Sequence, residues 1–163
     1  MKNFFLISFL LLQLSLFSQK SSVVLHIYAY YEQHLPGNIR VDEKGKAIHK
    51  DESVIDLIYA ETSSDEVKWE TGWKNGKTFS INTFLITQTP YEVGKKKSTK
   101  EQIFLTPAKG NKLWQLELQP AERQKISPIN AKKGEIILKG RYRGKIILKK
   151  INPKIELFVP NAV

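Results

Sequence analysis

The sequence predicts an all-β protein: an immunoglobulin-like β-sandwich of about eight or nine short antiparallel strands, with a small β-barrel as the alternative. Apolar and polar residues alternate along many short segments, which is the periodicity of strands with one buried face. Turn signals recur roughly every ten residues, and only one short segment has helix-forming character. Sandwich and barrel both bury one face of each strand.

The first predicted strand covers 23–34, which is rich in β-branched and aromatic residues and ends at Leu35-Pro36-Gly37. The polar stretch that follows, up to Ser53, is expected to be a long connection and a candidate binding loop, with a short hairpin around Lys44-Gly45. The second strand, 54–61, is apolar on both faces, which is typical of a central strand.

A hairpin is predicted from strands at 66–73 and 78–87, because Asn75-Gly76 lies between them. Further strands are expected at 102–106, 113–119 and 155–159, and the segment 121–125 has the composition of one or two helical turns.

The stretch 134–150 reads Gly-x-Ile-Ile-Leu-Lys twice. Its even positions are apolar or small and its odd positions are mostly charged, so we expect one buried face and one basic face. A hairpin with a five-residue loop at 140–144, or one long strand bent at its glycines, keeps this separation. A two-residue turn at Arg143-Gly144 would mix the faces and is disfavoured.

The first 18 residues combine Lys2, an apolar run interrupted by Gln13 and a small residue, Ser18, which is the pattern of a secretory signal peptide. We expect cleavage after Ser18 and a single domain over 19–163; an uncleaved anchor is the alternative. The Ser-Gln junction after a Phe/Leu-rich segment resembles export signals of small envelope proteins in Bacteroidetes-type bacteria. The chain has no cysteine, which excludes disulfides and a lipoprotein anchor and, with the signal, predicts a periplasmic or extracellular protein.

Charge is divided unevenly between the two halves of the chain. Residues 19–90 carry 8 Lys/Arg and 10 Asp/Glu, whereas residues 91–163 carry 17 and 6. Such asymmetry indicates an anionic partner, expected to be an envelope polysaccharide, a lipid head group or an acidic protein, and nucleic acid is disfavoured because the chain is expected to be exported. The predicted binding residues are Lys95, Lys96, Lys97, Lys100, Lys139, Arg141, Arg143, Lys145 and Lys149.

No catalytic, phosphate-binding or metal-binding motif is recognisable, and no cofactor is predicted. We therefore expect a non-enzymatic binding or accessory protein. Two alternatives stay open: a carbohydrate-binding module that uses an exposed Trp73, and a structural subunit that pairs with a partner through an edge strand. A hydrolase built from Asp56 and a histidine is a further hypothesis.

Overall fold

The computed structural model of the chain describes residues 22–34, 40–41, 47–48 and 53–159. The all-β prediction is confirmed, since the described residues form strands and no helix. The helical turns expected at 121–125 are wrong, because this segment is non-helical. In chain order the strands are β1 (Val24–His34), β2 (Arg40–Val41), β3 (Ala47–Ile48), β4 (Ser53–Thr62), β5 (Lys68–Lys74), β6 (Lys77–Ile86), β7 (Tyr91–Lys95), β8 (Gln102–Leu105), β9 (Lys112–Pro120), β10 (Ile136–Tyr142), β11 (Lys145–Ile151) and β12 (Ile155–Leu157).

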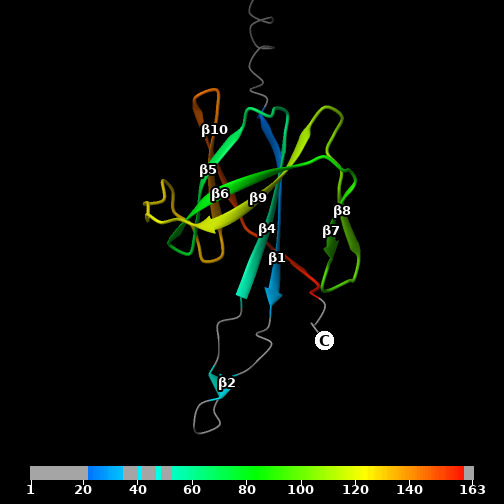
Figure 1. Cartoon of the computed structure of the whole chain (residues 1–163), viewed down its shortest axis with the longest axis vertical. Helices are drawn as coiled ribbons and strands as arrows, with labels where there is room; N and C mark the ends of the chain where they lie inside the picture. The colour runs from blue at the N-terminus through cyan, green and yellow to red at the C-terminus, as the bar shows by residue number, and fades with distance from the viewer. Residues whose placement is uncertain (1–21, 35–39, 42–46, 49–52, 160–163) are drawn as a thin grey trace, which may run out of the picture.

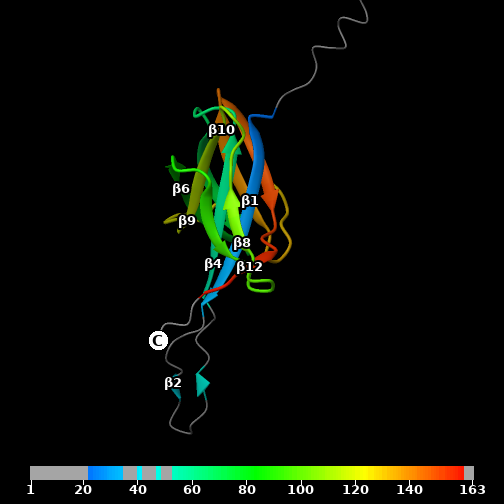
Figure 2. The same ribbon diagram turned by 90° about the vertical axis from the view of Figure 1, so that its right-hand side faces the viewer.

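Eight strands form one sheet in the order β11-β10-β5-β6-β9-β4-β1-β12, and this sheet curls strongly into a half-barrel (Figures 1 and 2). Neighbouring strands are antiparallel except β1 and β12, whose parallel pairing corrects the expectation of purely antiparallel strands. Residues 152–154 alone connect the two edge strands, β11 and β12. Because such a link spans at most about 14 Å from Ile151 to Ile155, the end of β11 and the start of β12 must lie within that distance of each other.

The predicted hairpin between β5 and β6 is confirmed. Lys74 pairs with Lys77 around Asn75 and Gly76, whose φ angles are 50° and 77°. These positive values are those of a type I′ turn, in which Asn-Gly is favoured. The short hairpin expected around Lys44-Gly45 is also confirmed, since β2 pairs with β3 on either side of it.

The inner face of the curled sheet holds the main core, which draws residues from strands at both ends of the sheet. The outer face is partly covered by the hairpin of β7 and β8, which packs over β1, β4 and β9 and forms a second core. The second half of β4 is buried on both sides, as its sequence predicted, with Ile58 in the inner core and Tyr59 in the outer one, whereas Val54 and Ile55 at its start are each 48% exposed. The inner core contains Val24, Ile58, Ala60, Val67, Trp69, Ile81, Leu116, Ile136 and Leu138.

The register of 134–150 differs from both favoured geometries. β10 and β11 pair from Tyr142 with Lys145, so the turn has only two residues, Arg143 and Gly144, with φ angles of 48° and 75°. This is the register that the sequence analysis disfavoured. It places Gly140 opposite Ile147, so the side chains at even positions of β10 share a face with those at odd positions of β11.

Two further predictions fall outside the described residues: the signal peptide at 1–18 and most of the long connection before Ser53. In the described part of the chain, no helix is long and apolar enough to cross a membrane.

Candidate functional site

The turn between β7 and β8 carries the densest run of lysines, and residues 95–100 are called the basic tip. Two backbone hydrogen bonds attach it to the β12 segment: Lys97 N donates to Glu156 O, and Phe158 N donates to Lys95 O, both at 2.8 Å. The tip is therefore held against the end of the main sheet.

A cavity of about 610 Å³ lies between the basic tip and the β11–β12 link. Three lysines from two separate segments line it together with hydroxyl groups. We call it the tip cavity, and its lining residues are Tyr31, Lys96, Lys97, Ser98, Thr99, Lys154, Ile155 and Glu156. Of these, only Lys96 and Lys97 belong to the binding set predicted from the sequence. Lys154 was missed because no local pattern marks it; it lies in the β11–β12 link, which runs beside the basic tip.

Each lysine of the tip cavity has a different set of partners. Lys96 Nζ lies 2.6 Å from an oxygen of Glu101, and Lys97 Nζ lies 2.6 Å from an oxygen of Glu156. Lys154 has no ion pair within the described residues, although it lines the cavity. The cavity therefore has one ammonium group that is not already matched by a carboxylate.

Lys100, also in the predicted set, contacts an aromatic ring. Its Nζ lies 3.5 Å from the centre of the Phe158 ring, which is a cation–π contact. This contact helps to hold the basic tip against the chain after β12. Lys95 is exposed and has no ion pair in the described part of the chain.

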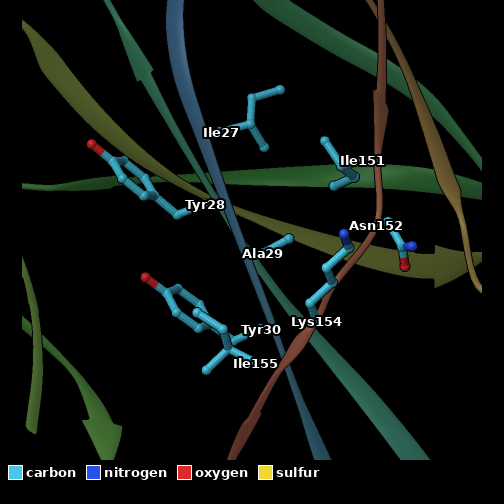
Figure 3. A pocket seen from close by; sticks show the side chains of 8 residues that line it. All are labelled: Ile27, Tyr28, Ala29, Tyr30, Ile151, Asn152, Lys154 and Ile155. Atoms are coloured by element: carbon cyan, nitrogen blue, oxygen red, sulfur yellow. The ribbon is translucent and has the colours of Figure 1, made fainter. Parts of the chain in front are cut away.

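A second cavity, of about 350 Å³, lies beside the first along the open gap between β1 and β11, which we call the seam. Figure 3 shows Ile27 of β1 and Ile151 of β11 turned toward each other across it, with the Lys154 side chain alongside. Tyr28 points to the other side of β1. Because Lys154 lines both cavities, they form neighbouring parts of one recessed region.

The remaining predicted binding residues do not share a surface with the tip. Lys139 and Arg141 lie on the outer face of β10 and both contact Glu70 of β5, at 3.7 Å and 2.7 Å. Arg143, in the turn, lies 2.8 Å from Glu66. Acids from the first half of the sequence thus neutralise cations from the second half.

The Arg143–Glu66 pair shifts the titration of both groups. The hydrogen bond and the charge of Arg143 hold the pKa of Glu66 below its ordinary value, and Glu66 raises the pKa of Arg143. Both side chains are well exposed, so the pair contributes little to stability.

Lys145 and Lys149 point to the inner-face side of β11, together with Ile147. The expectation that they share a basic face with Lys139 and Arg141 is wrong, because the two-residue turn puts these pairs on opposite sides of the hairpin. Neither Lys145 nor Lys149 has an ion pair within the described residues.

Trp73 does not have the exposure expected of a sugar-binding residue. It is 6% exposed, and its Nε1 donates a hydrogen bond of 2.9 Å to Lys125 O in the segment that follows β9. The hydroxyl group of Thr78 donates a hydrogen bond of 3.0 Å to the same carbonyl oxygen. Since this segment covers the indole, the carbohydrate-binding hypothesis loses the residue on which it was based.

Asp56 and the described histidines lie on opposite faces of the sheet. Asp56 is on the inner face, where its Oδ2 lies 2.5 Å from Lys74 Nζ of β5. His26 and His34 are on the outer side of β1, opposite Glu61 and Ser53 in register. Neither the tip cavity nor the seam cavity is lined by Asp56 or a histidine, and the opposite faces of Asp56 and the described histidines give the hydrolase hypothesis no geometric support.

Glu61 is a buried acid that the sequence analysis did not single out. Its Oε1 accepts hydrogen bonds from the Asn111 side chain and from Ala108 N, and Tyr28 donates to Oε2 at 3.3 Å. Burial raises the pKa of Glu61, but these hydrogen bonds outweigh that effect and hold the pKa below its ordinary value. Glu61 therefore serves to fix the turn before β9 onto β4.

Within residues 22–34 and 53–159 and the short β2 and β3, no three side chains are grouped as metal ligands would be. Comparison of the chain with protein-family models, with curated proteins and with solved structures finds no match.

Proposed function

We propose that this chain is an exported, non-enzymatic binding protein of the bacterial envelope that holds an anionic partner at the tip cavity. The observation that carries the proposal is the convergence of Lys96, Lys97 and Lys154 on one hollow. Ammonium groups beside hydroxyls are donors suited to carboxylate, sulfate or phosphate oxygens. The signal-like segment 1–18 supports export.

Lys154 is the central residue of this proposal. Lys96 and Lys97 already contact Glu101 and Glu156, so these carboxylates partly neutralise the positive charge that the two lysines bring to the cavity. Lys154 has no such carboxylate in the described residues, so an anion entering the cavity supplies the missing counter-charge. The tyrosine, serine and threonine hydroxyls of the lining can then donate further hydrogen bonds.

For the scaffold we propose the small-barrel alternative in place of the immunoglobulin-like sandwich. Continuous pairing through eight strands and the short link between the two edge strands support this choice. The barrel-like closure also brings the link against the basic tip, which is what creates the cavity.

Retention on a heparin column across a sodium chloride gradient tests the binding role. Lys154→Glu is expected to elute at clearly lower salt than the wild type, because the cavity then contains an extra acid. Lys77→Glu is the matched control: it makes the same charge change at an exposed residue, the first of β6. If both variants shift equally, binding depends only on net charge and the tip cavity is not the site; a wild type that is not retained at all also contradicts the proposal.

A further inference from the structure

β11 is an edge strand, so only one side of its backbone is hydrogen-bonded within the sheet. Tyr142 and Lys145 flank the two-residue turn and therefore exchange the first hydrogen bonds of the hairpin. By the alternation of an antiparallel ladder, the backbone N–H and C=O groups of Ile146, Leu148 and Lys150 then point away from β10. This outward row is a template for one more strand.

The strand across the seam is also unpaired over part of its length. β12 pairs with β1 only at Tyr30, Tyr31 and Glu32, so residues 24–29 have no strand partner on that side in the described chain. β1 and β11 are not paired with each other, and the cavity lined by Ile27 and Ile151 opens between them. The edge of β11 therefore has no strand partner in the described chain, and its last residue, Ile151, borders this cavity.

The side chains of β11 are apolar where a surface strand is usually polar. Ile146 and Leu148 point to the outer side and are 58% and 38% exposed. Two large aliphatic side chains next to a free backbone edge form an apolar strip that a neighbouring strand would cover.

The charges on this strand identify the kind of partner. Lys145 and Lys149 lie four positions apart on the inner-face side and have no ion pair within the described residues. On the adjacent strand, Lys139 and Arg141 share Glu70. An incoming strand with acidic residues at the matching spacing would neutralise the lysines of β11, as Glu70 neutralises the cations of β10.

We infer that β11 docks an extended, acidic segment of a partner polypeptide, which joins the sheet by strand addition. In this arrangement the partner places carboxylates opposite Lys145 and Lys149 and β-branched side chains opposite Ile146 and Leu148. Main-chain hydrogen bonds to the outward row supply affinity, and the alternation of side chains supplies specificity. The outward row of Ile146, Leu148 and Lys150 lines neither cavity, so the inference does not depend on the proposed function.

The probe is a fluorescein-labelled peptide with the core Glu-Val-Thr-Val-Glu, flanked by Ser-Gly at both ends. The core reads the same in both directions, so it matches β11 in parallel or antiparallel orientation. Binding to the full chain is followed by fluorescence anisotropy, and amide hydrogen exchange is measured with and without saturating peptide. The peptide is expected to slow exchange at Ile146, Leu148 and Lys150, and to leave Ile147, whose N–H faces β10, unchanged.

Proline at position 148 isolates the backbone contribution. Leu148→Pro removes a donor that β10 does not use, which edge strands tolerate, and it is expected to weaken peptide binding about tenfold or more. Leu148→Ala keeps the N–H and loses only apolar contact, so its loss is expected to be smaller. Unfolding midpoints of both variants verify that the hairpin is intact.

Charge variants test the specificity of the edge. Lys145→Gln and Lys149→Gln are each expected to weaken binding about fivefold at low salt and hardly at all at high salt. Lys139→Gln is the matched control on the same hairpin, and Lys77→Gln, at the exposed start of β6, is the control for net charge; both are expected to bind the peptide as the wild type does.

Three results would overturn the inference. The first is unchanged binding by a folded Leu148→Pro variant, and the second is equal binding of a Lys-Val-Thr-Val-Lys peptide. The third is no binding at millimolar peptide together with aggregation of the Lys145→Ala, Lys149→Ala double variant. That outcome would show that the lysines only protect the edge from self-association.

Discussion

β10 and β11 contain the same run of four residues, Ile-Ile-Leu-Lys, at positions 136–139 and 146–149. In β10, the three apolar side chains are fully buried, at 0% exposure. In β11, Ile146 and Leu148 are 58% and 38% exposed. β10 has a strand on each side, whereas β11 has one neighbour and an open edge. Identical local sequence therefore has different physical roles: in β10 it builds the core, and in β11 it leaves a surface that can bind.

The comparison is tested most strongly by removing the same side chain from both strands. Leu138→Ala is expected to lower the free energy of unfolding by about 2–5 kcal/mol, because it leaves a cavity in a filled core. Leu148→Ala removes the equivalent side chain at a partly exposed site and is expected to cost less than about 1 kcal/mol. Urea unfolding with unchanged m-values measures both. Equal losses would mean that β11 is as well packed as β10.

The next position to compare is Gly140 in β10 with Lys150 in β11, which follow the shared run at the same distance. A Cβ added at Gly140 would lie 2.8 Å from Lys68 O and 3.1 Å from an atom of the Trp69 ring. Gly140→Ala is therefore expected to destabilise the protein by about 1–3 kcal/mol through overpacking. Lys150→Ala, at an exposed position, provides the control in the same unfolding experiment. A Gly140→Ala midpoint equal to that of the wild type would show that the close approach is easily relieved.

A smaller effect is expected from the charges that distinguish the two strands. Glu70→Gln removes the acid shared by Lys139 and Arg141 and is expected to cost less than about 1 kcal/mol, because the three side chains are partly exposed. The loss should shrink further in 1 M salt, where exposed ion pairs are screened. A loss that persists in high salt would point to packing by Glu70 instead of charge.

The smallest effect concerns Glu135, which occupies the place in the first repeat that Lys145 occupies in the second. A hydrogen bond from Lys132 N, together with Lys150, holds the pKa of Glu135 below its ordinary value of 4.5. A lowered pKa in the folded state stabilises the fold above pH 4.5 and ceases to do so as the pH falls through the folded-state value. Glu135→Gln should therefore unfold at a slightly lower denaturant concentration than the wild type at pH 7, and this difference should shrink as the pH falls below 4.5. A difference that is unchanged at low pH would exclude this linkage.

The strands themselves could be predicted because alternation and turn chemistry are local properties. Asn75-Gly76 predicted the hairpin of β5 and β6, which the structure contains. The two-sided apolar pattern of β4 predicted a central strand, and β4 lies between β9 and β1. The register of β10 and β11 could not be predicted from the same reasoning. The prediction assumed that both arms of the hairpin keep their basic residues on the same face. β11 is an edge strand and need not bury either face fully, so a two-residue turn at Arg143-Gly144 can form although it mixes the faces.

The candidate sites depend on segments that are distant in sequence. Trp73 was expected to be exposed because it lies next to Gly72 and a turn, but the carbonyl of Lys125 and its neighbours cover it. Likewise, Lys154 belongs to the short link between β11 and β12, the two edge strands of the curled sheet. This link lies beside the basic tip, which is far from it in sequence. No pattern within a short window of sequence contains this information.

The parallel pairing of β1 with β12 has a consequence for the order of folding. Tyr30 and Ile155 are neighbours in the sheet although nearly the whole described chain separates them in sequence. During synthesis, β1 can pair with β4 early, but its other edge must wait for the last strand. Closing such a long loop late makes for slow folding, and until then the edge of β1 stays open to other chains.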